Sequence, residues 1–292
     1  MAARPDPTTT LVDRRAELLA GGRSRTDAEE LDELTSSLRS ALESTAPTVR
    51  QVTLGDDAAL LERLRRDEAV HPANSTAEFE RRFAQDRRCV VLEHPELPGR
   101  ALNVVFCALW QGLARDLAPV LDPRRPIDDP TRADTAIFYS IWNVEPGLAG
   151  LPGGRELLER TVELLSDELP GLRSFATLSP IPGLRRWMSD RHEAADTDSP
   201  IGRPLLQAAA RYLVERRPDG RPLDPVARFH LGNGARLVAL DADADLSEDG
   251  VQRSFGVMAD YRYAPEDRAA NRAALDRGAP ALGDEVVALL GT

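Results

Sequence analysis

Four glycines directly precede a stretch with helical spacing, and they are the first residues whose pattern suggests chemistry. They lie in FYSIWNVEPGLAGLPGGRELLERTVELL and are Gly147, Gly150, Gly153 and Gly154. Glycines let the backbone approach an anion, and the free N–H groups at a helix N-terminus point toward it. Pro146 and Pro152 each remove one donor, and the spacing is not that of a dinucleotide-binding fingerprint. The pattern therefore predicts either a phosphate site or a turn without a ligand.

The remaining residue types exclude several other kinds of site. The chain has no lysine, so all 37 basic residues are arginines. A Walker-A phosphate loop, a pyridoxal Schiff base and a lysine-borne biotin are therefore excluded. No metal-ligand spacing occurs among the histidines and cysteines, and we predict no metal site. These residues are His71, His94, His192, His230, Cys89 and Cys107.

Charge and hydropathy limit the partners that we expect. Asp and Glu number 48 against 37 basic residues, which gives a net charge of −11. A nucleic-acid binder normally shows a basic excess, so we expect no nucleic-acid partner. No apolar run approaches the roughly 20 residues that span a bilayer, and residues 1–7 contain no apolar signal region. With two cysteines only, we expect a reducing, cytoplasmic location and no membrane partner.

The elements that must position these residues follow from apolar periodicity. Residues 1–9 are predicted to be disordered, and 10–19 and 27–42 to form a short helical hairpin that packs on the main body or another subunit. Further helices are predicted over 56–67, 76–85, 155–169, 205–216 and 283–290. Strands are predicted over 88–93, 102–109, 136–141, 175–179, 235–239 and 256–263. This mixture predicts an α/β or α+β body.

Several motifs in the main body together resemble the catalytic domain of the malonyl-CoA decarboxylase family. They are EAVHP (68–72), FYSI with the glycine loop, FATLSPIPGLRRW (175–187), DPVARFHLGNGARL (224–237) and GVMADYRY (256–263). The likeness runs in the same order over roughly residues 48–275. It implies a GNAT-like acyl-CoA-binding domain with a mixed central sheet over 48–292. A short helical segment over 1–47 precedes it, as in a shortened member of the family.

The resemblance also assigns roles to single residues. The family's catalytic serine and histidine correspond to Ser179 in SPIPG and His230 in FHLGNG. Tyr263 and Ser140 match two further positions in the family's active site. The family's glycine loop carries the CoA pyrophosphate, which assigns Gly147, Gly150, Gly153 and Gly154 to that group. No cofactor beyond the CoA moiety of the substrate is implied.

The residue types suit this chemistry, although each has a plainer interpretation. Loss of CO2 from a malonyl thioester leaves an enolate, which needs hydrogen-bond donors and then a proton. A histidine with a pKa near 6.5 can supply that proton, and a serine can pass it on or hold the carboxylate. Alternatively, His230 is a structural residue at a strand or turn edge, Ser179 starts a turn and Tyr263 is a packed aromatic. Asn233 is expected to take a left-handed turn conformation.

The sequence departs from the family pattern and leaves the reaction open. Pro152 replaces an acidic residue that follows the glycine loop, and Trp142 is expected to reshape the acyl pocket. We predict first a decarboxylase of malonyl-CoA or a close thioester. A GNAT-like acyltransferase is the alternative, which would move an acyl group from CoA or an acyl carrier protein to an amine, with His230 as base. A non-catalytic CoA-binding protein is a third possibility. A homo-oligomer is expected, and the short helical region favours a dimer.

Overall fold

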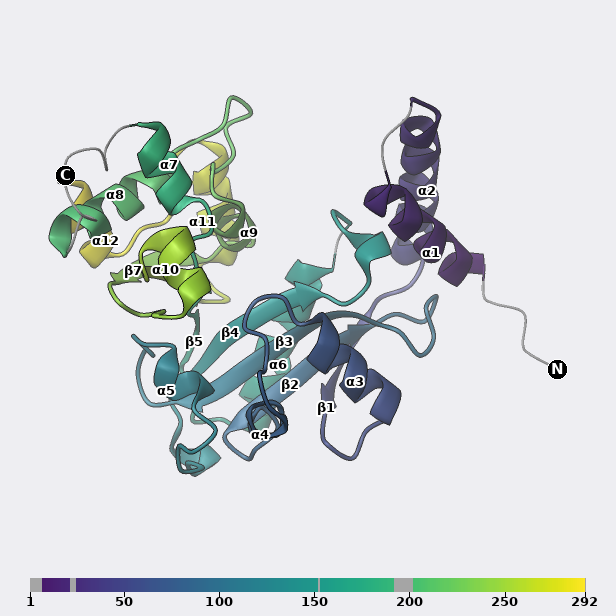
Figure 1. Ribbon diagram of the computed structural model, residues 1–292, viewed down its shortest axis with the longest axis horizontal. Helices are drawn as coiled ribbons and strands as arrows, with labels where there is room; N and C mark the ends of the chain where they lie inside the picture. The colour runs from purple at the N-terminus through teal and green to yellow at the C-terminus, as the bar shows by residue number, and fades with distance from the viewer. Residues whose placement is uncertain (1–6, 22–24, 152, 192–201, 292) are drawn as a thin grey trace. The chain divides into compact units, whose positions relative to one another are not determined.

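The computed structural model describes residues 7–21, 25–151, 153–191 and 202–291, and its elements are labelled in Figure 1. Contacts between residues divide the chain into two compact units. The N-terminal unit contains residues 1–107 and 140–170, and the C-terminal unit contains 108–139 and 171–292. The predicted domains, 1–47 and 48–292, are a different division and stay a prediction.

The predicted helical hairpin is present in the N-terminal unit as α1 (Pro7–Ala20) and α2 (Arg25–Glu43). The prediction of disorder was wrong for residues 7–9, which form the first turn of α1, while residues 1–6 lie outside the described part of the chain. Proline is tolerated in the first turn of a helix, where its missing N–H would have no partner. Helix α1 contacts the short 3-10 helix η2 (Pro146–Leu148), so the hairpin packs within its own unit.

The sheet of the N-terminal unit has the order β1-β2-β3-β4. Its strands are β1 (Thr48–Val52), β2 (Arg87–Glu93), β3 (Ala101–Trp110) and β4 (Thr135–Asn143). Strand β1, which was not predicted, pairs antiparallel with β2. The other helices of this unit are α3 (Ala58–Asp67), α4 (Thr76–Arg81) and α6 (Gly154–Glu168). Helix α6 begins where the glycine loop ends and contacts β1 and β2.

Strands β3 and β4 continue into the C-terminal unit, where β4 pairs parallel with β5 (Ser174–Thr177). Strand β8 (Met258–Tyr263) pairs antiparallel with β5, with β6 (Ser179–Pro180) and with β7 (Arg236–Asp241). The predicted strand over 175–179 is thus divided in two, although both parts keep one register along β8. At the division, the Tyr261 N–H donates to the Thr177 hydroxyl oxygen, and the Leu178 N–H donates to the carbonyl of Phe138.

The described helices of the C-terminal unit surround this part of the sheet in chain order. They are α5 (Ala118–Leu121), η1 (Pro130–Arg132), α7 (Leu184–Asp190), α8 (Arg203–Val214), α9 (Pro225–Gly232), α10 (Glu248–Ser254), α11 (Arg268–Asp276) and α12 (Asp284–Leu290). The helices predicted over 205–216 and 283–290 correspond to α8 and α12. The mixed α/β architecture is therefore confirmed.

Helix α9 corrects two predictions about the residues around His230. His230 lies inside this helix and not at a strand or turn edge, because Asp224 caps the helix and Pro225 occupies its first position. Asn233 has φ −86°, whereas Gly234 takes the left-handed conformation with φ 84°. A Cβ atom at residue 234 would lie 2.6 Å from the carbonyl oxygen of Arg268, so glycine is required there.

Candidate active site

Three of the predicted site residues form one hydrogen-bonded row in the C-terminal unit. The Ser179 Oγ atom lies 3.1 Å from Nε2 of His230, and the Tyr263 hydroxyl oxygen lies 2.7 Å from Nδ1 of the same ring. The three residues are 5%, 4% and 4% exposed, respectively. Residues far apart in the sequence are thus brought together in a site that is almost free of solvent contact.

Short, well-anchored elements hold this row in place. Ser179 is on β6, His230 is on α9, and Tyr263 is the last residue of β8. The Asp224 carboxylate accepts the N–H groups of Val226 and Ala227 and so stabilises the first turn of α9. Since α9 has only eight residues, a change at its cap is transmitted directly to the position of the imidazole.

The Ser179 proton decides how the other two hydroxyl and ring protons are arranged. Ser179 donates to Oγ1 of Thr177 at 2.8 Å, so its oxygen is an acceptor toward the imidazole. His230 then carries its proton on Nε2 and donates it to Ser179. The unprotonated Nδ1 accepts the O–H of Tyr263. In this arrangement every group of the row has a partner, and the tautomer of His230 is set by Tyr263.

Burial keeps the row uncharged at neutral pH. It lowers the pKa of His230 to about 3 and raises the pKa of Tyr263 well above its ordinary value. The imidazole is therefore neutral and the phenol protonated. Such a site offers N–H and O–H donors to a developing oxyanion without carrying a cation that would hold a substrate carboxylate.

Sequence reasoning missed two residues that contact this row. The Tyr261 ring stacks on the imidazole of His230, with ring centroids 4.5 Å apart and planes inclined by 22°. Thr177 accepts the Ser179 proton and also the N–H of Tyr261. The sequence gives a signal only for Tyr261, which precedes Tyr263 by two residues and therefore lies on the same face of β8.

Ser140 belongs to a different cluster, in the N-terminal unit. Its hydroxyl donates to Oε1 of Glu68 at 2.6 Å, and the same oxygen accepts the backbone N–H of His71 at 2.8 Å. The other oxygen of Glu68 forms a buried ion pair with Arg82, which also donates to the carbonyl of His71. The EAVHP motif thus supplies a carboxylate that holds Ser140, and Glu68 was not among the predicted site residues.

The glycine loop lies at the end of β4 in the N-terminal unit. Gly147 is within η2, Gly150 has φ 78°, and Gly153 and Gly154 lead into α6. These positions provide backbone N–H groups at the start of a 15-residue helix, as a phosphate site requires. Pro152, at the family's acidic position, lies outside the described residues.

Trp142 is buried just before the glycine loop. Its ring packs on Phe106, with centroids 5.4 Å apart. Its predicted effect on the acyl pocket stays a prediction.

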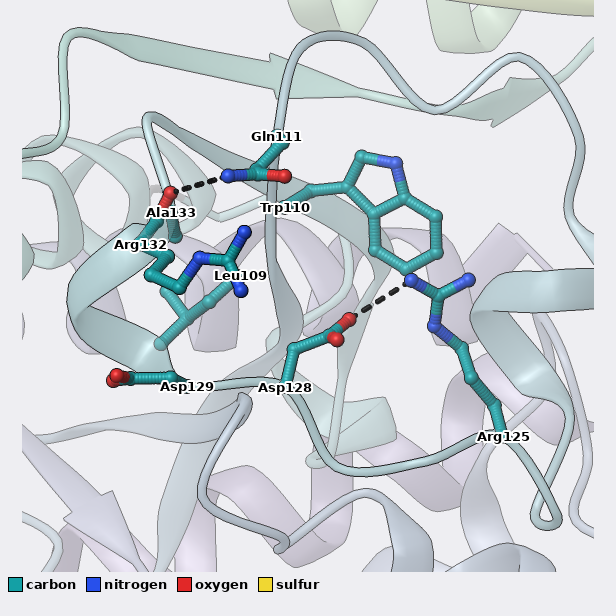
Figure 2. Close-up of a pocket in the computed structure, with 8 residues that line it drawn as sticks. All are labelled: Leu109, Trp110, Gln111, Arg125, Asp128, Asp129, Arg132 and Ala133. Carbon is teal, nitrogen blue, oxygen red and sulfur yellow. Dashed lines mark hydrogen bonds and ion pairs between the residues drawn. The ribbon is translucent and has the colours of Figure 1, made fainter.

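A second polar pocket lies at the end of β3 in the C-terminal unit (Figure 2), with a volume of about 250 Å³. The Arg125 guanidinium stacks over Trp110 at 4.1 Å and pairs with Asp128 at 2.8 Å. None of the predicted site residues is among those that line this pocket. With its arginine paired to an aspartate, the pocket shows no preference for one class of ligand.

Two further searches cover the described residues only. Within residues 7–21, 25–151, 153–191 and 202–291, no group of three or more His, Cys, Asp or Glu side chains could hold a metal ion. In the same part of the chain, no helix has the length and apolar character needed to cross a membrane.

Comparison with known proteins gives consistent results. Residues 48–203 and 189–290 match the family described as malonyl-CoA decarboxylase C-terminal domain. Malonyl-CoA decarboxylase, mitochondrial, of Anser anser anser is 29% identical over 314 residues, which cover 90% of this chain and 62% of that protein. The chain therefore spans less than two thirds of that relative's length.

Solved structures agree on the fold. Malonyl-CoA decarboxylase from Agrobacterium vitis has a TM-score of 0.89 and 36% identity, and the match covers 98% of this chain and 77% of that one. A GNAT-like decarboxylase in complex with isobutyryl-CoA has a TM-score of 0.51 and 21% identity, covering 74% and 98% of the two chains. The latter supports the GNAT-like fold alone. From the family match over most of its length, together with these structures, we conclude that the chain belongs to the malonyl-CoA decarboxylase family.

Proposed function

We propose that this protein decarboxylates a malonyl thioester, with malonyl-CoA giving acetyl-CoA and CO2. The observation that carries the proposal is the buried, uncharged row of Ser179, His230 and Tyr263. Its support comes from a family whose similar members, including the Agrobacterium vitis protein, are named malonyl-CoA decarboxylase. Acyl transfer to an amine is not proposed, since no contact in the site favours an acceptor.

In the first step, the bond between the malonyl carboxylate and the α-carbon breaks. Its electron pair becomes the enolate of the thioester, and CO2 leaves. A substrate carboxylate in a poorly solvated site is destabilised relative to neutral CO2, which favours this cleavage. Because His230 is neutral, the protein supplies no imidazolium that would pair with the carboxylate and stabilise the ground state.

In the second step, the α-carbon receives a proton. We infer that the Ser179 hydroxyl turns from Thr177 toward the enolate and gives up its proton, and that the Nε2 proton of His230 replaces it. The Tyr263 O–H donates to Nδ1 and so supports the proton that His230 gives up. One proton from solvent then restores the row, so the reaction consumes one proton for each CO2 released.

The CoA part of the substrate is assigned to the glycine loop. Backbone N–H groups around Gly150, Gly153 and Gly154 would hold the diphosphate at the start of α6. The reaction requires no further cofactor, because the thioester itself delocalises the electron pair.

The test is mass spectrometry of the purified protein incubated with malonyl-CoA in D2O. Wild type is expected to give acetyl-CoA with one deuterium in its methyl group, whereas His230→Ala is expected to lose at least a hundredfold in rate. Ser166→Ala provides a matched control for Ser179→Ala, since Ser166 only bonds the carbonyl of Val162 on α6. Malonyl-CoA that stays unchanged with wild type would refute the proposed reaction.

A further inference from the structure

We propose that the N-terminal helical hairpin is a working part of the acyl-CoA site, and that Arg15 of α1 is a positioning residue for the glycine loop. This inference rests on the proposed function, because it assigns the loop to the CoA moiety of the substrate. It concerns the N-terminal unit only. Figure 1 shows α1 and α2 as the purple helices at the start of the chain.

Arg15 reaches from the hairpin to the backbone of the loop. Its Nη1 atom donates to the carbonyl oxygen of Gly147 at 2.6 Å, and its Nε atom donates to Oγ1 of Thr35 at 3.0 Å. Thr35 in turn donates to the carbonyl of Leu31, so α2 fixes the orientation of the guanidinium. One side chain therefore ties both helices of the hairpin to the loop.

The burial of Arg15 is costly and calls for a function. The residue is 5% exposed, and its described partners are a carbonyl and a hydroxyl rather than a carboxylate. Burial lowers its pKa, and no carboxylate opposes that shift. A buried cation without a counter-ion is unfavourable for stability. A positive charge directly behind a loop that binds a diphosphate would recover part of this cost when the anion is present.

The backbones of helix and loop also touch directly. A Cβ atom at residue 147 would lie 2.0 Å from the carbonyl oxygen of Val12, so only glycine permits this approach. Leu148, the next residue of the loop, belongs to an apolar cluster with Val12 and Leu38 of the hairpin. The hairpin therefore contributes packing as well as a hydrogen bond.

The residue before the loop is held by two more arginines. Glu145 is buried and accepts Arg63 at 2.7 Å and Arg100 at 3.2 Å. Arg100 also pairs with Asp13 of α1 at 2.7 Å. The segment is thus fixed on the Glu145 side by ion pairs and at Gly147 by Arg15.

This fixation has a specific consequence for ligand binding. A glycine-rich loop loses much conformational freedom when its N–H groups align on an anion, and that loss weakens binding. A loop that is already ordered avoids it. Ser179, His230 and Tyr263 belong to the other unit, so a change at Arg15 is expected to alter KM and leave kcat unchanged.

The experiment compares Arg15→Ala with Arg14→Ala, because these neighbours on α1 differ in what they contact. Arg14 is an exposed residue that pairs with Glu17 and Glu30. We expect Arg15→Ala to raise KM for malonyl-CoA and the calorimetric Kd for CoA about tenfold, with kcat within twofold. Arg14→Ala is expected to leave all three values unchanged. Equal KM and Kd in both variants would overturn the inference.

Two further variants separate positioning from folding. Thr35→Val removes the hydroxyl that orients Arg15 and is expected to raise KM less, about threefold. Arg15→Lys keeps a donor for the Gly147 carbonyl and is expected to restore part of the affinity. A purely structural role would lower the thermal midpoint and the active fraction while KM stayed constant, and this result would also overturn the inference.

The outcome for wild type distinguishes the two proposals. If wild type binds CoA but leaves malonyl-CoA intact, the proposed reaction is wrong, and the CoA Kd of the variants still decides the role of Arg15. If wild type does not bind CoA, both proposals are wrong.

Discussion

The Tyr263 hydroxyl oxygen lies 2.7 Å from Nδ1 of His230, although the two residues are 33 positions apart. This contact sets the tautomer, because a phenol that donates to Nδ1 leaves the ring proton on Nε2, facing Ser179. The geometry of the whole row therefore depends on a single hydroxyl group at the end of β8.

Tyr263→Phe is expected to lower kcat ten- to a hundredfold with little change in KM. Without the phenol, the ring proton can move to Nδ1, and Nε2 can no longer donate to Ser179. The variant also leaves a buried ring nitrogen unpaired, at a cost of about 1–3 kcal/mol in stability. Steady-state kinetics and urea unfolding measure both effects. Unchanged kcat would show that Tyr263 only packs against its neighbours.

The pH dependence of the rate tests the neutral state of His230. Burial lowers its pKa from 6.5 to about 3, so the imidazole stays neutral over the whole range from pH 5 to 8. We expect kcat/KM to show no inflection from this group near pH 6.5. An inflection there that is absent from His230→Gln would contradict the assignment, since it would require a histidine that titrates in the free enzyme.

Helices with strong periodicity and buried strands could be predicted from the sequence, because their signals are local. The residues 10–19 and 27–42 and the strand 102–109 lie within the observed elements α1, α2 and β3. Helix α9 was missed although Asp224-Pro225 is a good helix start, because eight residues ending in Asn-Gly resemble a turn.

The predicted site depended on the family resemblance more than on local pattern. Ser179, His230 and Tyr263 do meet, but Ser140 lies with Glu68 in the other unit. The division of the predicted strand at Thr177 depends on its partner β8, and the contact of Arg15 with Gly147 joins residues 132 positions apart. Such long-range contacts leave no trace in local periodicity.

A buried carboxyl pair predicts that stability falls as the pH rises. Burial and the neighbouring Asp241 raise the pKa of Asp260 to about 9, whereas an unfolded aspartate titrates near 4. Between these values the folded state holds a proton that the unfolded state has lost, so stability falls with pH by up to about 1.4 kcal/mol per unit. The charged groups nearby are Arg115, which pairs with Asp241, and Glu285.

The variant Asp260→Asn removes this titration with little change in volume. We expect its free energy of unfolding, measured in urea at pH 5, 6.5 and 8, to depend less on pH than that of wild type. It should also exceed the wild-type value at pH 8. Parallel curves for the two proteins would show that Asp260 does not hold the proton.

The last prediction concerns the cap of the helix that carries His230. The buried Asp224 carboxylate accepts two backbone N–H groups of α9, so Asp224→Ala leaves these donors unpaired and is expected to cost about 1–2 kcal/mol in stability. It should also lower kcat, because His230 is in the sixth position of an eight-residue helix. Asn caps helices as well as Asp does, so Asp224→Asn is expected to keep both kcat and the deuterium incorporation near wild type. If the asparagine variant lost activity as strongly as the alanine variant, the Asp224 charge rather than its hydrogen bonds would be required. The helix cap would then not explain how His230 is positioned.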